Sequence, residues 1–187
     1  MRMHENATDE EIALSARKYR QDFAILVERY QDKLLRYIRR IGAGEEAEDL
    51  LQEIFINAFR YLNGFDPSLS FSSWIYRIAH NTTISAYRKK KIRPHGNLIE
   101  DGDEFLANIG TDEDIATELE TKCSVEEINN ALLSIKQKYR DVVVLRYVEE
   151  LEYKEISDVL KIPMGSVASL LSRAKKNLKD EISGKSK

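Results

Sequence analysis

Several features that mark common protein classes are scarce or absent in this chain of 187 residues. Its one cysteine, Cys123, cannot form an internal disulfide, which fits the reducing cytoplasm. No apolar run is long enough to span a bilayer and the mean hydropathy is −0.47, so we expect no direct membrane insertion. The basic residue at the N-terminus, Arg2, is not followed by an apolar stretch, so the chain does not begin like a secretory signal.

Patterns that hold a metal, a cofactor or a reactive side chain are missing as well. The three histidines, His4, His80 and His95, are too scattered to form a ligand set, and no Gly-rich phosphate loop is present. No nucleophile is paired with a base. We therefore expect no enzyme activity, no metal site and no cofactor.

An excess of basic residues is also lacking. The formal net charge is −3, which taken alone argues against a nucleic-acid partner. The acidity belongs to the middle of the chain, however, because residues 96–124 hold 9 acidic and 1 basic side chain. Residues 1–95 hold 13 acidic and 16 basic side chains, and residues 125–187 hold 10 acidic and 12 basic side chains. The middle segment buries little apolar surface and repels itself, so it is expected to be a flexible linker, either a solvated loop or a functional tether.

The first basic segment has the apolar periodicity of successive helices. Thr8 and Glu11 have the spacing of a capping box, which predicts a short helix starting there. Apolar residues then recur every three or four positions over residues 23–41, and the Gly-Ala-Gly sequence at 42–44 ends that helix. The next helix begins near Glu45, with a predicted buried stripe of Ala47, Leu50, Leu51, Ile54, Phe55, Ala58, Phe59 and Leu62. Its outer side is either a solvated polar face or a partner-binding face, and holds Asp49, Gln52, Glu53 and Asn57.

A turn-rich segment over residues 63–68 leads into a long helix from Phe71 to about Lys91. One face is apolar and includes Trp74, whereas a second face carries Tyr76, His80, Thr83 and Tyr87 beside Arg77, Asn81 and Arg88. Aromatic rings interleaved with cations suit melted nucleic acid, because bases stack on rings and cations hold phosphates. Two plainer interpretations stay open: Trp74 as a core residue, and the terminal cations as a match to the helix dipole.

The second basic segment has the pattern of a helix-turn-helix. A capping box at Ser124 opens one helix and a second follows from about Tyr139. A helix over residues 153–160 is then separated by a tight break at 161–163 from a helix over 164–179. The outward face of that last helix begins with small residues and continues with cations, which suits insertion into a DNA major groove, although helical hairpins also occur without DNA. We therefore predict an all-α protein of two small helical domains, residues 1–95 and 125–187, joined by the acidic linker over 96–124.

Three runs of residues together resemble the bacterial RNA polymerase sigma factors of the extracytoplasmic-function (ECF) group. They are AEDLLQEIFINAF at 47–59, FSSWIYRIAHN at 71–81, and the C-terminal stretch from YRDVVVLRY at 139–147 through RAK at 173–175. The resemblance covers about residues 20–92 and 125–180, in the order of that family and with a linker between. It implies a dissociable transcription-initiation subunit without chemistry of its own, which directs the polymerase to specific promoters and helps to melt the minus-ten element.

The resemblance also implies roles for individual residues. The outer face of the helix at 45–62 would bind the core polymerase through Asp49, Gln52, Glu53 and Asn57. The turn at 63–70 and the helix after it would hold the melted minus-ten strand through Asn63, Phe65, Ser70, Trp74, Tyr76, Arg77, His80, Asn81, Arg88 and Lys89. The helix-turn-helix would read the minus-thirty-five element as duplex through Gly165, Ser166, Ser169, Ser172, Arg173, Lys175 and Lys176.

The partners implied by the resemblance are the beta-prime and beta subunits of core polymerase, promoter DNA and an anti-sigma factor. The expected location is the cytoplasm, with the option of being held at the membrane by that anti-sigma factor. The alternatives are a stand-alone helix-turn-helix regulator and a protein that binds polymerase without initiating transcription.

Several positions depart from the common pattern of the family. Ser85 stands where an Asp is usual, Lys136 where a Pro often opens the helix, and Lys161 where a Gly relaxes the turn. A residue other than glycine held at positive φ costs about 1 kcal/mol or more, so we expect the turn at Lys161 to be either strained or differently shaped. Ala168 and Leu170 replace residues that are often basic, which shifts the phosphate contacts onto Arg173, Lys175 and Lys176.

Overall fold

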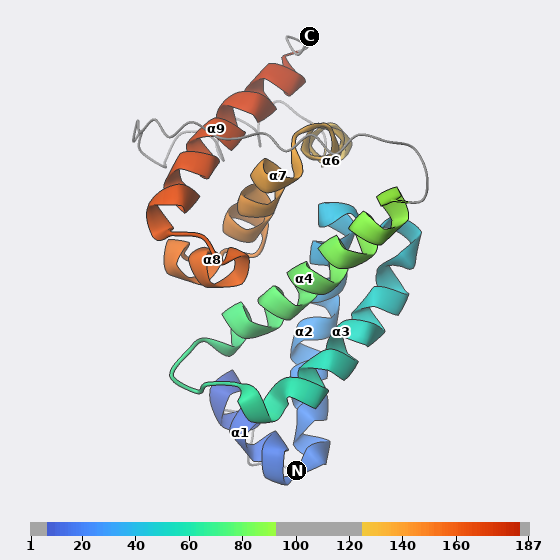
Figure 1. The fold of residues 1–187 in the computed structure, drawn as a ribbon, viewed down its shortest axis with the longest axis vertical. Coiled ribbons are helices and arrows are strands. Elements are labelled where there is room, and N and C mark those ends of the chain that lie inside the picture. Colours follow the sequence, from blue (N-terminus) through green and yellow to red (C-terminus); the bar gives the residue numbers. More distant parts are fainter. Residues whose placement is uncertain (1–6, 93–124, 184–187) are drawn as a thin grey trace. The chain divides into compact units, whose positions relative to one another are not determined.

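The computed structural model describes residues 7–92 and 125–183, and every regular element within them is helical (Figure 1). The helices form two compact domains, as predicted, each of which is considered by itself. The linker predicted over 96–124 and the capping residue Ser124 lie outside the described residues. Within the described ranges, no helix combines the length and apolar character needed to cross a bilayer.

The N-terminal domain is built from four α-helices joined by short 3₁₀ and π segments. Its elements are α1 (Asp9–Lys18), η1 (Arg20–Asp22), α2 (Phe23–Ile38), η2 (Arg39–Ala43), η3 (Gly44–Glu46), α3 (Ala47–Tyr61), η4 (Leu62–Gly64) and α4 (Phe71–Ile92).

Local sequence signals set the boundaries of the first helices. The capping box at the start of α1 is confirmed: the Glu11 N–H donates to Thr8 Oγ1 over 3.2 Å, and the Thr8 N–H donates to Glu11 Oε2 over 2.9 Å. The break after α2 is confirmed as well, because Gly42 and Gly44 have φ values of 126° and 53°. Residues with a Cβ rarely adopt such angles, so the glycines let the chain reverse into α3.

The core of the N-terminal domain lies between α2, α3 and α4. Helix α2 packs along α3 (Figure 1) and buries the predicted face from Phe23 to Ile41, on which Val27 alone is half-buried. The start of α4 adds an aromatic cluster, in which Phe71 contacts the rings of Tyr30, Phe65 and Trp74 at centroid distances of 5.4 to 5.5 Å. Edge-to-face and tilted packing of this kind stabilises a core beyond its buried area.

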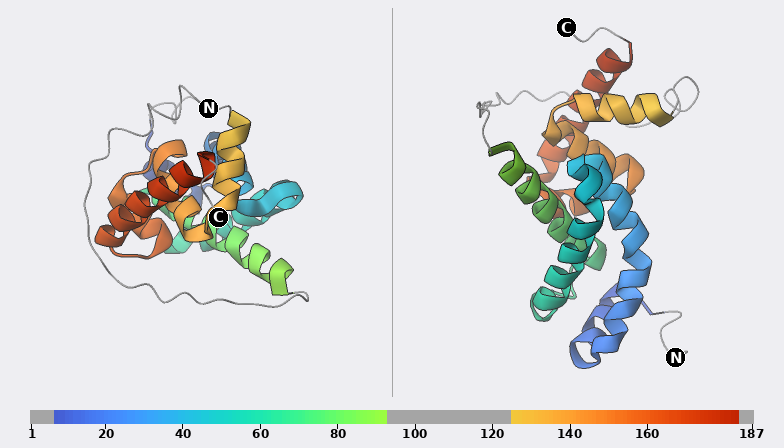
Figure 2. Two further views of the ribbon diagram at one scale, coloured as in Figure 1. Left: turned by 90° about the horizontal axis from the view of Figure 1, so that it is seen from above. Right: turned by 90° about the vertical axis from the view of Figure 1, so that its right-hand side faces the viewer.

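The C-terminal domain contains the predicted helix-turn-helix. Its elements are α6 (Val125–Ser134), α7 (Gln137–Val143), the π segment η5 (Val144–Val148), α8 (Tyr153–Leu160) and α9 (Met164–Ile182). Helix α9 packs on both α7 and α6 (Figure 2). Its residues Val167, Leu171, Ala174 and Leu178 are buried, as predicted. The helix predicted from Tyr139 begins two positions earlier, at Gln137.

A buried arginine fixes the corner between α6 and α7. Arg140 donates from Nε to the carbonyl of Leu132 and from an Nη to the carbonyl of Leu133, both over 2.6 Å. These carbonyls belong to the last turn of α6, where the intrahelical donors have run out. The guanidinium therefore caps α6 from the next helix and sets the angle at which α7 leaves it.

Candidate nucleic-acid interface

The outer face of α3 presents the residues predicted to bind a partner. Asp49, Gln52 and Glu53 are exposed, and Asn57 is half-buried nearer the core. The opposite side of the helix is buried through Ala47, Leu50, Ile54 and Ala58. Ile56 adds an apolar side chain to the exposed part of the helix, with 57% of its surface accessible. This face therefore combines charge with one exposed aliphatic group.

Phe59, by contrast, was predicted to belong to the buried stripe of α3, and this prediction is wrong. The side chain is 38% exposed. It lies in the last turn of α3, where its ring meets Phe23 edge-on at 5.2 Å and the guanidinium of Arg20 lies 5.9 Å above it. The helical period correctly gave the direction of the ring, but it gave no information on how far the neighbouring helix extends.

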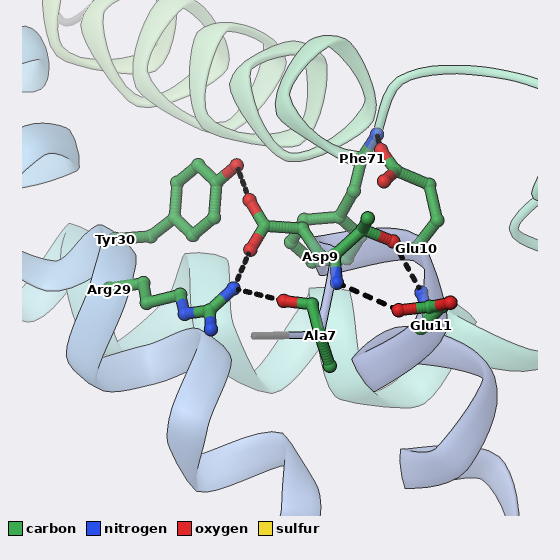
Figure 3. A network of polar contacts seen from close by, with 8 residues as sticks. Ala7, Asp9, Glu10, Glu11, Arg29, Tyr30 and Phe71 are labelled. Carbon is green, nitrogen blue, oxygen red and sulfur yellow. Dashed lines mark hydrogen bonds and ion pairs between the residues drawn. The ribbon is translucent and has the colours of Figure 1, made fainter. Parts of the chain in front are cut away.

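The segment between α3 and α4, residues 62–70, is held at both ends by α1. At its start, Arg17 donates from Nε to the carbonyl of Leu62 over 3.1 Å and from an Nη to the carbonyl of Phe65. At its end, a Glu10 carboxylate oxygen accepts the N–H of Phe71 over 2.8 Å (Figure 3). An acidic side chain at the first residue of α4 also suits the helix dipole.

Helix α1 is itself fixed to α2 through Asp9. Its carboxylate accepts from Arg29 over 2.6 Å and from the Tyr30 hydroxyl over 2.5 Å (Figure 3). Burial raises the pKa of Tyr30, and the hydrogen bond to Asp9 raises it further, so the phenol stays protonated and keeps donating. Arg29 also donates to the carbonyl of Ala7 over 3.1 Å. Nothing in the sequence beyond the capping box pointed to these ties, because each joins residues far apart in the chain.

The segment also has order of its own. The Asp66 carboxylate accepts the N–H of Ser68 over 2.9 Å, and this bond lowers the pKa of Asp66. The Leu69 N–H donates to the Asp66 carbonyl over 3.0 Å, which closes a turn. Asn63 is exposed and Ser70 is half-buried at the two ends of the turn.

Three aromatic residues assigned to minus-ten DNA are not on the surface. Phe65, Trp74 and Tyr76 are 2%, 8% and 2% exposed, so the structure does not present these three rings on a surface that DNA could reach. The physical reason is the packing of α4 on α2: the Tyr76 ring meets Tyr37 edge-on at 5.1 Å, while Phe65 and Trp74 pack on each other at 5.3 Å. Phe65 thus anchors the segment at 62–70 to the start of α4, through Trp74 and Phe71.

The expected second face of α4 is therefore only partly accessible. Thr83 is buried and donates its hydroxyl to the carbonyl of Ala79 over 2.8 Å, whereas Tyr87 is 41% exposed. His80 is half-buried, with Nδ1 3.1 Å from the Tyr37 hydroxyl. The cations and the amide of α4 that were assigned to DNA are more accessible than these residues. Asn81, Arg88 and Lys89 are exposed, and Arg77 is half-buried.

In the C-terminal domain the turn before α9 has the strained backbone, which was one of the two alternatives expected. Lys161 has a φ of 57°, in the left-handed region. The Ser157 hydroxyl spans the turn by donating to the carbonyl of Ile162 over 2.6 Å. Pro163 then has a φ of −59°, and its carbonyl accepts the N–H of Ser166 over 2.8 Å, which starts α9.

The face of α9 assigned to duplex DNA is open at its N-terminal end. Gly165 and Ser172 are exposed, while Ser166 and Ser169 are half-buried. The Ser169 hydroxyl donates to the carbonyl of Gly165 over 3.0 Å. Of the cations, Lys176 is exposed, and Arg173 and Lys175 are half-buried. Lys175 lies 5.7 Å from the centre of the Tyr147 ring, which holds it near the helix surface.

The departures from the family pattern have local structural contexts. Lys136 has a φ of −56°, which is also the angle that proline imposes, so the position keeps a proline-like backbone without the ring. Ala168 and Leu170 are half-buried, and Ser85 is exposed. Nothing in the structure explains the Ser at position 85.

Comparisons with known proteins decide the family. The model of sigma-70 region 2 matches residues 26–92, and that of sigma-70 region 4 matches residues 125–178. The ECF RNA polymerase sigma factor SigW of Bacillus subtilis is 37% identical over 168 residues, which cover 86% of this chain and 88% of that protein. The chain belongs to the ECF RNA polymerase sigma factors.

Other relatives have the same description. The ECF sigma-E factor of Haemophilus influenzae is 30% identical over 96% of this chain and 98% of its own length. The RNA polymerase sigma-H factor of Pseudomonas aeruginosa is 32% identical over 82% of each chain. A stand-alone regulator has no need of region 2, so membership in this family disfavours that alternative.

Solved structures share the fold of this sigma factor. The structure of CnrH in complex with the cytosolic domain of CnrY matches with a TM-score of 0.70 at 23% identity, over 95% of this chain and 99% of that one. RpoE of Bartonella quintana, solved in complex with the anti-sigma factor NepR, matches with a TM-score of 0.67 at 18% identity, over 87% and 98%.

Proposed function

We propose that this ECF sigma factor binds core RNA polymerase, directs it to a defined set of promoters and holds the melted minus-ten strand. The observation that carries the proposal is the order of the two matched regions, each on a helical domain with an exposed polar face: region 2 at 26–92 and region 4 at 125–178. Neither domain is proposed to perform catalysis.

The core polymerase is proposed to dock on the outer face of α3. Asp49, Gln52 and Glu53 are exposed on this helix. The carboxylates of Asp49 and Glu53 are one turn apart, which suits a basic partner surface on the beta-prime subunit. Asn57 lies one further turn along. Contact with the beta subunit is proposed from the family resemblance alone.

Minus-ten DNA is proposed to lie along the segment at 62–70 and the accessible side of α4. The contacting groups are Asn63, Ser70, Arg77, His80, Asn81, Arg88 and Lys89. Phe65, Trp74 and Tyr76 take a different role, since they are buried beneath this surface and give it a rigid base. A rigid base lowers the ordering cost that strand capture would otherwise carry.

Duplex DNA of the minus-thirty-five element is proposed to receive the N-terminal part of α9 in its major groove. Gly165, Ser166 and Ser169 allow a close approach because they are small, and Ser172 continues that face. Arg173, Lys175 and Lys176 supply the phosphate contacts. The acidic linker over 96–124, with the domains bounded at residues 95 and 125, is proposed to let the two domains span both elements.

An anti-sigma factor is a proposed further partner, because a structural neighbour was solved bound to one. Such a factor would hold this protein inactive, in the cytoplasm or at the membrane.

Transcription with purified components tests the proposal. The chain plus core polymerase should give promoter-specific transcripts, whereas the chain alone should bind promoter duplex poorly. Asp49→Ala with Glu53→Ala should weaken core association without unfolding the chain, as fluorescence of the single tryptophan, Trp74, would report. The pair Asp32→Ala and Glu28→Ala, exposed on α2, is the matched control. Tight, specific duplex binding by the free chain with no stimulation of core enzyme would reject the proposal.

A further inference from the structure

A basic hollow lies between the end of α1 and the end of α3. Its volume is about 210 Å³, and its walls carry Arg17, Arg20, Arg60, Phe59 and Asn63, with Ala16 and Leu62 as the remaining lining. No carboxylate is among these lining residues. We call this site the arginine hollow.

The three guanidinium groups are presented in different ways. Arg17 is fixed, because it donates to the carbonyls of Leu62 and Phe65. Arg20 and Arg60 are exposed, and Arg20 lies above the ring of Phe59. One anchored and two movable guanidinium groups make a strong site for a phosphate, which they bind with paired hydrogen bonds.

The hollow also offers a surface for a base. The Phe59 ring is 38% exposed beside these cations, although the period of α3 predicted it to be buried. Asn63 adds an amide that both donates and accepts hydrogen bonds, as base edges do. The neighbouring Tyr19 and Tyr61 are 48% and 59% exposed. Cations interleaved with exposed rings, which the sequence suggested for α4, are thus also present here.

We propose that the arginine hollow binds one nucleotide of single-stranded DNA, with the phosphate on Arg20 and Arg60 and the base against Phe59. A volume of about 210 Å³ is below the range of sites for drug-sized ligands, so it suits one nucleotide unit better than a large cofactor. The inference rests on the proposed function for the source of the strand, since Asn63 begins the segment proposed to hold minus-ten DNA. Arg17 and Arg20 precede the matched region at 26–92, so the site includes residues outside it.

An acidic protein segment is the main competing occupant. Its carboxylates would pair with the guanidinium groups, but it would not use the exposed ring of Phe59 as a stacking surface. The ring therefore favours nucleic acid, and the experiment separates the two.

Binding of fluorescent single-stranded oligonucleotide tests the inference directly. Two probes are used: the oligonucleotide with the full chain alone, and a promoter fork with a single-stranded non-template extension together with holoenzyme. Arg20→Ala with Arg60→Ala should lower the affinity for both by about tenfold. The slope of log affinity against log salt should also become shallower, by about 0.7 for each phosphate that is no longer neutralised. Arg36→Ala, an exposed cation on α2, is the matched control and should change neither quantity.

Phe59→Leu keeps an apolar side chain against Phe23 but removes the stacking surface. It should weaken oligonucleotide binding by about tenfold while Trp74 fluorescence reports an intact fold. Inorganic phosphate and a mononucleotide serve as competitors, and both should displace the oligonucleotide only weakly. Binding of the mononucleotide as tightly as the oligonucleotide would point to a free-nucleotide site and overturn the inference.

The remaining outcomes are equally decisive. Unchanged affinity in both substituted proteins would overturn the inference, and so would a loss confined to core association, which would assign the hollow to a protein partner. Failure of the proposed function looks different: wild type would then give no promoter-specific transcripts, whereas the oligonucleotide measurement on the chain alone still decides the role of the hollow.

Discussion

Asp141 is a carboxylic acid at a position that disfavours its charge. It is 6% exposed in α7, and burial raises its pKa to about 7. Gln137 donates to the carboxylate over 2.7 Å and the charge of Arg140 lies nearby, and both act in the opposite direction without cancelling the effect of burial. In the unfolded chain the same group titrates near its ordinary value of about 3.9.

We expect this difference to make stability depend on pH. Between about pH 4 and pH 7 the folded state retains a proton that the unfolded state releases, so stability falls as pH rises through this window and is level above it. Asp141→Asn keeps an acceptor for Gln137 and removes the titration. The variant should be more stable than wild type at pH 8, by on the order of 1 kcal/mol or more, and equal to it near pH 4. Urea denaturation followed by circular dichroism measures this, and a difference independent of pH would contradict it.

Lys161 stores strain in the turn of the helix-turn-helix. Its φ of 57° costs a residue with a side chain about 1 kcal/mol, which glycine avoids at the expense of some entropy. Lys161→Gly should therefore stabilise the C-terminal domain by about 0.5 kcal/mol, measured by the same denaturation. Lys161→Ala retains the strain and serves as the control. Lower stability of Lys161→Gly than of Lys161→Ala would show that the turn is not strained, because only the entropic cost of glycine would then remain.

At the scale of elements, α1 positions the segment that leads into α4. Arg17 holds the start of that segment, Glu10 caps its end at Phe71, and Asp9 ties α1 to α2. Because both ends of this loop are fixed, its middle can adopt few other conformations. Helix α1 therefore influences the minus-ten contacts by positioning the segment at 62–70, in addition to lining the arginine hollow.

Substitution of Glu10 separates this positioning from general stability. Glu10→Ala leaves the Phe71 N–H without its acceptor, which costs about 1 kcal/mol and should loosen the start of α4. Amide hydrogen exchange should speed up at Phe71 and Leu69, and affinity for melted minus-ten DNA should fall a few-fold. Glu10→Gln keeps a carbonyl oxygen for the same bond and should behave nearly as wild type. Faster exchange throughout the N-terminal domain in Glu10→Ala would instead mean that α1 supports the whole core.

Trp74 belongs to the same element and gives a contrasting prediction. Because it is 8% exposed among Phe65 and Phe71, Trp74→Ala should destabilise the N-terminal domain by about 3 kcal/mol or more. Duplex binding and strand opening by the holoenzyme should then fall together, as thermal unfolding and permanganate footprinting of thymines would record. If strand opening alone were lost while the thermal unfolding temperature stayed unchanged, Trp74 would instead contact DNA directly.

At the scale of the whole molecule, charge is distributed so that DNA binding depends on a partner. The formal net charge is −3, and each helical domain has only a small excess of basic residues. Phosphate contacts supply most non-specific affinity, so the free chain should bind duplex weakly and with strong salt dependence.

Neutralising the linker tests this distribution. Changing its 9 acidic residues between 96 and 124 to Gln or Asn takes the formal net charge from −3 to +6. The free variant should bind non-specific duplex more tightly than wild type at low salt, with the difference shrinking as salt rises, in a gel-shift titration. The same number of neutral substitutions within the linker is the control. Equal binding by variant and wild type would show that the linker charge has no effect on duplex affinity.

Much of this architecture could be predicted from the sequence, because the signals that set it are local. Caps, glycines and the spacing of apolar residues predicted where α1, α4 and α9 begin and which face of α2 is buried. The start of α3 was placed near Glu45, two residues too early, because Glu45 and Glu46 belong to a 3₁₀ turn. It did not predict the burial of Tyr76, because the ring that covers it, Tyr37, lies on a helix distant in the chain. The tie between Glu10 and Phe71 was missed for the same reason.

The bracing by α1 also limits how this protein can be recombined with its relatives. A chimera that exchanges promoter preference would naturally be cut at the edge of the matched region, Leu26, and would then join a foreign minus-ten segment to the native α1. The carboxylate of Glu10 and the guanidinium of Arg17 would face a backbone that they did not evolve to hold. Grafts that start at Ala7 transfer the brace together with the segment it fixes, and are the units in which this domain can be exchanged.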